Sequence, residues 1–134
     1  MYVMPDPEAA MINYLKAQMG ARTEPYRALT VTPKFPESSA TYHVQVELEA
    51  GNADDYPATE RSQVRFTCWA PPGRRSDVKD LAALTQALVL TFPGSATVAG
   101  TSSLGGRSDV SEDPDTQRLM CWFLARVNLL PVAL

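Results

Sequence analysis

The residues best suited to chemistry in this chain are one histidine, His43, and two cysteines, Cys68 and Cys121. A nucleophilic cysteine needs a base within hydrogen-bond reach, and a zinc site needs three or four ligands. Because His43 lies on the polar side of an alternating run and both cysteines lie on apolar sides, we expect them on opposite faces. The sequence therefore predicts neither a Cys–His pair nor a zinc site.

His43 is expected to be an ordinary surface or interface residue, with a pH-sensitive contact as the alternative. Cys68 and Cys121 each lie in a strand-like run, so they are candidates for cross-strand neighbours. We expect free thiols rather than a disulfide, since unpaired cysteine is often buried as a small apolar residue. Phosphate-binding, dinucleotide-binding and G-x-S-x-G motifs are absent from the sequence.

The acidic stretch near the C-terminus partly matches a calcium-binding loop. Asp109, Ser111 and Asp113 occupy positions one, three and five of an EF-hand register. Position six is Pro114 where glycine is needed, and position twelve is Met120 where glutamate is needed. The match fails at its most important positions, so we predict a solvated loop that could contact a protein partner.

The remaining candidates are protein contacts rather than catalytic groups. A tryptophan within a strand either packs in the core or lies at a subunit interface, where tryptophan is enriched, and both interpretations stay open. The weakly polar face of the second predicted helix is either plain surface or a subunit contact. The candidate interface residues are Trp69, Arg74, Arg75, Leu90, Asp109, Glu112, Asp113 and Asp115.

Length and charge narrow the function classes. The 134 residues suit a single domain spanning 1–134. The net charge of −3, without a basic stripe, argues against a nucleic-acid-binding surface. The N-terminus lacks the pattern of a signal peptide, and the apolar stretch 81–90 is too short to cross a bilayer. We therefore expect a protein that is used or assembled in the cytosol.

Two helices are expected to position these residues. Asp6 and Pro7 begin the first helix, over residues 7–19, and Gly20 is expected to end it in a left-handed conformation. Ser76 is expected to cap the second helix, over residues 77–92, and Pro93-Gly94 follows it. Its apolar stripe recurs at helical spacing through Val78, Leu81, Thr85, Leu88 and Phe92.

Five strand-like runs complete the pattern: Leu29–Val31, Thr41–Glu49, Gln63–Trp69, Ala96–Ser103 and Leu119–Leu130. The second run alternates, with Tyr42, Val44, Val46 and Leu48 expected inward. The last run has apolar residues on both sides, which indicates cover on both faces at its start. The order predicts an α+β fold with a mostly antiparallel or mixed sheet and two main helices packed on one face.

The ordered layout resembles a tail terminator, or tail completion, protein of long-tailed, siphovirus-type bacteriophages, especially those infecting actinobacteria. The segments that carry the resemblance are, in order, MPDPEAAMINYLKAQMG, VTPKFP, YHVQVELEAG, VRFTCWAP, SDVKDLAALTQALVLTFPG and DPDT. They cover nearly the whole chain, although none is specific alone. The sequence departs from such proteins in an acidic Ala40–Glu49 run and in a TSSLGGRSDVSE stretch rich in glycine and serine.

The resemblance implies a structural virion protein without enzymatic activity or cofactor. Such proteins form a ring, usually of six copies, that caps the head-proximal end of the tail tube and stops its polymerisation. The implied partners are further copies of the chain, the tail tube protein and the head-completion or stopper protein. Genomic DNA would pass through the ring without sequence-specific binding, and no membrane is involved. The implied location is the tail–neck region of the virion, assembled in the host cytoplasm.

Two alternatives stay open on the sequence. The nearer one is a head-closure or neck protein, and the other is a small cytosolic adaptor domain with a ligand pocket.

A ring also needs two different patches on each subunit, and the weak edge strand Ala96–Ser103 is a candidate for pairing with a neighbour.

Overall fold

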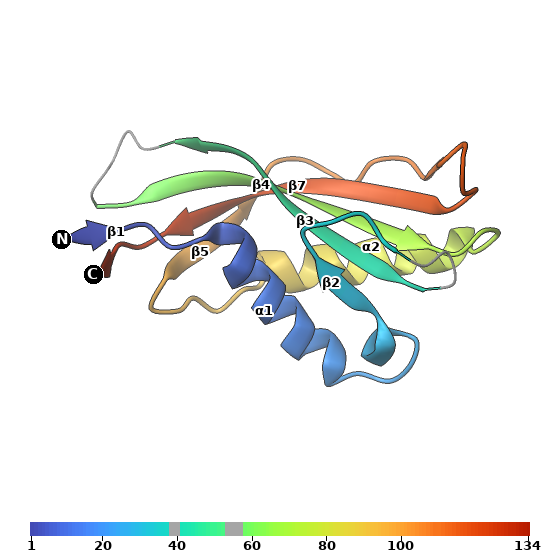
Figure 1. Cartoon of the computed structure of the whole chain (residues 1–134), viewed down its shortest axis with the longest axis horizontal. Coiled ribbons are helices and arrows are strands. Elements are labelled where there is room, and N and C mark those ends of the chain that lie inside the picture. Colours follow the sequence, from blue (N-terminus) through green and yellow to red (C-terminus); the bar gives the residue numbers. More distant parts are fainter. Residues whose placement is uncertain (38–40, 53–57) are drawn as a thin grey trace.

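A mixed sheet backed by two helices forms the body of the protein (Figure 1). The computed structural model describes residues 1–37, 41–52 and 58–134. The helices are α1 (Pro7–Gly20) and α2 (Arg75–Leu90), with a short 3-10 turn, η1 (Tyr26–Ala28), between α1 and the sheet. The strands of the main sheet are β2 (Thr30–Thr32), β3 (His43–Asn52), β4 (Glu60–Ala70), β5 (Val98–Ser103), β6 (Ser111–Glu112) and β7 (Leu119–Leu129). The predicted α+β class is confirmed.

The sheet has the order β2-β3-β4-β7-β5, with β6 also paired to β7. The β2–β3 pair is parallel, and the other pairs are antiparallel. Cys68 and Cys121 lie directly opposite each other on β4 and β7, and both are buried free thiols. The predictions that the two cysteines are cross-strand neighbours and unbridged are therefore confirmed.

Helix α1 begins as its sequence predicts. The Asp6 carboxylate accepts a hydrogen bond from the Glu8 amide at 2.9 Å, and Pro7 occupies the first turn. The predicted left-handed cap at Gly20 is wrong, because the helix includes Gly20 and ends on Ala21 in a right-handed conformation. The Arg22 amide bonds to the Met19 carbonyl at 3.1 Å, so the last turn closes without a left-handed residue.

Helix α2 lies beside α1 under β4 and β7, with its stripe of Val78, Leu81, Thr85 and Leu88 buried as predicted. Its start differs from the prediction: the helix begins at Arg75, and Arg74 occupies the cap position without a side-chain hydrogen bond. Ser76 is therefore already inside the helix. Phe92 lies beyond the helix end and packs edge-on against Tyr14, with ring centroids 4.8 Å apart.

The alternation along β3 holds only in part. Val44 and Val46 are fully buried beneath the helices, as predicted. Leu48 is 45% exposed, against the prediction, because the end of β3 extends past the helix layer (Figure 1). His43 was expected on the surface and is only 2% exposed, because residues 33–37 cover the opposite face of the sheet at that point.

The edge of the sheet along β7 is built from several short pieces. Strand β5 pairs with the end of β7 and β6 with its beginning, and the Ser108 amide bonds to the Trp122 carbonyl at 2.7 Å between them. The predicted weak strand is thus confirmed as an edge, whereas the predicted loop after it is partly strand. The sequence patterns missed a small ribbon of β1 (Tyr2–Val3) and β8 (Val132–Ala133), which joins the two chain ends.

Candidate interaction surfaces

The outer face of the sheet, opposite the helices, carries a cover that we call the strap, residues 33–37. Phe35 of the strap lies edge-on against Trp69, with ring centroids 4.6 Å apart. Trp69 also donates from its indole nitrogen to the Gln45 side-chain oxygen at 3.2 Å. With only 4% of its surface exposed, Trp69 packs inside the chain, and the core interpretation of this residue applies.

The side chains of Arg118 and His43 donate hydrogen bonds to backbone carbonyls of the strap. The Arg118 guanidinium donates to the Pro36 carbonyl at 2.9 Å and lies over the Phe35 ring. His43 donates from Nε2 to the Lys34 carbonyl at 2.9 Å. Neither contact was predicted, although the two prolines flanking Phe35 signal an extended segment that cannot join a central strand.

His43 is neutral in this setting. With its Nε2 proton donated to Lys34, the Nδ1 atom accepts from the Thr30 hydroxyl at 2.5 Å. Burial, aided by the positive charge of Arg118, lowers the pKa of His43, while the hydrogen bond to the Lys34 carbonyl opposes this shift. The residue is therefore a packed structural histidine rather than a surface contact.

The two cysteines are also structural. Cys68 donates its weak thiol hydrogen bond to the Thr85 hydroxyl at 3.6 Å. Complete burial raises the pKa of Cys68 to about 12, so the reactive thiolate does not form near neutral pH. Cys121 donates to the Ser108 carbonyl at 3.2 Å. Neither cysteine has His43 as a partner, since His43 lies on the opposite face of the sheet.

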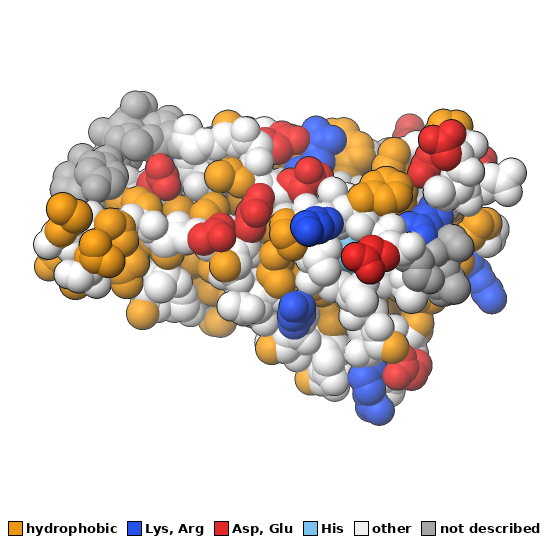
Figure 2. Space-filling view, in the orientation of Figure 1, with side chains coloured by type: hydrophobic (Ala, Val, Ile, Leu, Met, Phe, Trp, Pro, Cys, Tyr) orange, Lys and Arg blue, Asp and Glu red, His pale blue; other side chains and the backbone are white. Residues whose placement is uncertain are grey.

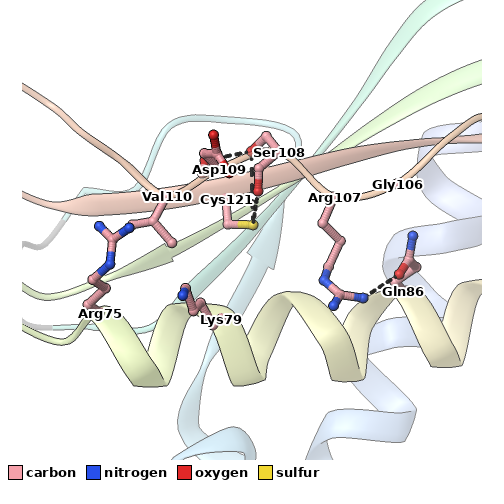
Figure 3. A pocket seen from close by; sticks show the side chains of 9 residues that line it. All are labelled: Arg75, Lys79, Gln86, Gly106, Arg107, Ser108, Asp109, Val110 and Cys121. Atoms are coloured by element: carbon pink, nitrogen blue, oxygen red, sulfur yellow. Dashed lines mark hydrogen bonds between the residues drawn. The ribbon is translucent and has the colours of Figure 1, made fainter.

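A polar groove of about 410 Å³ lies between α2 and residues 106–110, and we call it the basic groove. Figure 3 shows Arg75, Lys79 and Gln86 rising from α2 toward the segment that carries Arg107. Arg107 reaches across and donates to the Gln86 oxygen at 2.6 Å. The charged side chains that line the groove are three cations, Arg75, Lys79 and Arg107, and one carboxylate, Asp109. Two sequence candidates, Arg75 and Asp109, are therefore brought together.

Three of the other candidates lie at the end of β6 and in the turn that leads to β7, and we call residues 112–115 the acidic turn. The Asp113 carboxylate accepts hydrogen bonds from the Asp115 amide at 3.1 Å and the Thr116 hydroxyl at 2.9 Å. Asp113 thus shapes the turn, whereas Glu112 and Asp115 are exposed. Figure 2 shows acidic side chains gathered over this end of the molecule.

The last two candidates differ from each other. Arg74 is exposed at the start of α2, beside the groove residue Arg75. Leu90 was considered as an exposed contact, but it is half-buried and packs against the core. Because Leu90 packs against the core, it is not a free apolar patch.

On the outer face of the sheet, away from the strap, Arg65 forms an ion pair with Glu49 and lies over the Trp122 ring. Arg65 Nε lies 2.5 Å from Glu49 Oε1 without the geometry of a hydrogen bond. The Arg65 guanidinium also lies over the Trp122 ring, 4.4 Å from its centroid. Trp122 is consequently half-buried, so it completes this face rather than projecting from it.

Residues 1–37, 41–52 and 58–134 contain no group of three or more His, Cys, Asp or Glu side chains arranged to hold a metal ion. Within the same ranges, none of the helices combines the length and apolar character that crossing a bilayer requires.

Comparison with known proteins finds a chain of similar fold but shows no family for this protein. No family model matches the chain, and no curated protein is significantly similar to it. Among solved structures, the chain is similar to a chain of the "Virion of native gene transfer agent (GTA) particle". The TM-score is 0.56 at 12% identity, and the match covers 92% of this chain and 91% of the other. This protein therefore shares its fold with a protein found in that virion.

Proposed function

We propose that this chain is a structural protein of a phage-like virion, acting as a tail terminator. In this role it forms a ring, with six copies expected, that caps the head-proximal end of the tail tube. The ring stops tube polymerisation and joins the tail to the head-completion complex. The observation that carries the proposal is the fold similarity to a gene transfer agent virion chain across 92% of this chain, together with the sequence resemblance to tail terminators.

The distribution of surfaces supports a ring subunit. A head-to-tail ring requires two different patches on each copy, facing in different directions. Among the described residues, strands β2 and β5 form the two opposite edges of the sheet. An edge strand presents backbone groups that a neighbouring chain can pair with. Two unlike edges on one rigid subunit match this requirement, and the residues best suited to chemistry have structural roles instead.

The charge of the chain fits passage of DNA through such a ring. With a net charge of −3, the protein lacks the excess of cations that would hold the phosphate backbone. We propose that DNA moves through the ring without sequence-specific binding. Further copies, the tail tube protein and the head-completion protein are the proposed partners, in the neck region of a virion assembled in the host cytoplasm.

Assembly with the tail tube protein tests the proposal. The purified chain, alone and mixed with its tube protein, would be studied by native mass spectrometry and negative-stain microscopy. We expect hexamers or annular particles, and tubes that are closed at one end and shorter in its presence. A chain that stays monomeric in both settings and does not bind tubes would contradict the function.

A head-closure or neck protein is the second candidate, because the matched structure is described only as a virion. The two roles differ in partner. A terminator binds the tube end directly, whereas a neck protein binds the head-completion complex and leaves tube length unchanged. Ring formation without any effect on tube length would therefore favour the neck role.

A further inference from the structure

We propose that the basic groove of one copy binds the acidic turn of a second copy, as one contact in a head-to-tail assembly. The proposal rests on the proposed function, because it identifies the surfaces that would hold neighbouring ring subunits together. Its two partners are segments of the same chain with opposite charge and different shape: a groove and a projecting turn.

The groove concentrates positive charge on an acidic protein. Arg75 and Lys79 are four residues apart on α2, so they project from the same side of the helix. Arg107 faces them from the opposite wall (Figure 3). The first amides of α2 also lack a side-chain cap, which adds positive potential at the helix start, and Asp77 in the first turn offsets part of it. These cations outnumber the single carboxylate of Asp109, so the groove favours an acidic segment.

The acidic turn has the properties of a ligand for such a groove. It begins at the last residue of the two-residue strand β6 and projects at one end of the molecule (Figure 1). The Asp113 hydrogen bonds fix its backbone, so little conformational entropy is lost when it binds. Glu112 and Asp115 are exposed and free to meet cations outside their own chain.

The two surfaces do not neutralise each other within one chain. Across the parts of the chain that the structure describes, no ion pair joins a groove cation to an acid of the turn. Arg107 uses its hydrogen bond on the neutral Gln86. When the groove and the turn of one copy contact two different neighbours, this contact is heterologous and can repeat around a ring, whereas a reciprocal pairing would give a two-fold dimer.

Charge reversal provides the test. The groove variant Arg75→Glu/Lys79→Glu and the turn variant Glu112→Lys/Asp115→Lys would each place like charges at every groove–turn contact. Combining all four substitutions in one chain restores opposite charges with the signs exchanged. Lys16→Glu/Arg22→Glu, on and after α1, is the control with the same change in net charge as the groove variant.

Sedimentation velocity would compare self-association of all five proteins, with circular dichroism as the check that each is folded. We expect each two-site variant to weaken association about tenfold or more, the four-site variant to recover it, and the control to resemble wild type. A mixture of the groove and turn variants should also assemble, because opposite charges then meet at each mixed contact.

The outcomes separate this contact from the function. If every variant forms rings like wild type, or if the four-site variant stays as weak as the two-site variants, the groove–turn contact is wrong and the ring function stands. If wild type forms no ring even with the tube protein, the function and this contact fail together. A two-site variant that does not fold is replaced by the neutral pair Arg75→Gln/Lys79→Gln, which should still weaken association.

Discussion

At the scale of single residues, burial decides what the reactive groups can do. His43, Cys68 and Cys121 are the residues with the greatest catalytic potential, and all three are packed inside the chain. Their hydrogen bonds run to Thr30, Thr85 and main-chain carbonyls, so they stabilise the fold. The sequence candidates that remain exposed are charged residues such as Arg74, Glu112 and Asp115, and charged groups at a surface are suited to protein contacts.

Cys68 should resist alkylation in the native protein. Its thiol is fully buried and its pKa is raised to about 12, so both access and thiolate formation are blocked. Treatment with iodoacetamide at pH 8, followed by mass spectrometry of the peptides, should leave Cys68 unmodified until denaturant is added. Complete labelling of Cys68 under native conditions would show that the β4–β7 core opens readily.

Phe35 should stabilise the chain although it is 47% exposed. Replacement of Phe35 by alanine removes the edge-on contact with Trp69 and should lower the free energy of unfolding by about 1 kcal/mol. The tryptophan emission should also shift to longer wavelength as water reaches Trp69. Leu48→Ala is the matched control, because Leu48 is 45% exposed and should change stability by less than about 0.5 kcal/mol.

At the scale of elements, the strap and the edge of β7 show where local patterns stop being sufficient. Helix α1 follows from its Asp6 cap, α2 follows from its apolar spacing, and strands β3, β4 and β7 follow from alternation in the sequence. The side of the sheet that His43 faces was also predicted, but its burial was not, because the strap covers that end of the outer face. Residues 33–37 carry no periodic pattern, so only their contacts with Trp69 and Arg118 reveal this role.

The strap should make stability depend on pH through His43. The groups around the ring are Thr30, Lys34 and Arg118, with Glu37 lining the same cavity. Because the pKa of His43 is lower in the folded chain than its usual value of about 6.5, the unfolded chain takes up the proton first. The stabilising contribution is therefore present above about pH 6.5 and is lost as the pH falls through the folded pKa.

Urea unfolding between pH 7.5 and 5 measures this effect. We expect the free energy of unfolding to fall as the pH decreases through this range, and to fall less steeply for the variant His43→Gln. Carboxylates contribute equally to both proteins, so the difference between the two curves isolates the histidine. Parallel curves would mean that His43 titrates at its ordinary pKa in the folded chain.

At the scale of the whole molecule, one continuous core carries unlike surfaces. The sheet has two open edges, and the basic groove and acidic turn carry opposite charges. The core is continuous across α1, α2 and the sheet, so these surfaces keep fixed positions relative to one another. A ring subunit needs this combination, since closure depends on a constant angle between neighbours.

Salt should separate assembly from folding. Raising the sodium chloride concentration from about 0.05 to 0.5 M shortens the range of electrostatic attraction several-fold. We expect the assembled fraction to decrease in sedimentation velocity experiments, while the melting temperature of the subunit changes little, because the core is apolar. An assembly that strengthens with salt would indicate contacts dominated by apolar surface instead.

The sequence by itself determined the helices, most strands, the free thiols and the absence of familiar catalytic motifs, because caps, alternation and spacing act over a few residues. Only the tertiary structure decided that Trp69 and His43 are covered, that Leu90 is half-buried, and that Arg75 and Asp109 share a groove. These outcomes depend on contacts such as Arg118 with Pro36, which lie 82 residues apart in the chain. Patterns over a few residues cannot predict such pairs, because each residue of a pair meets its partner only after the chain has folded.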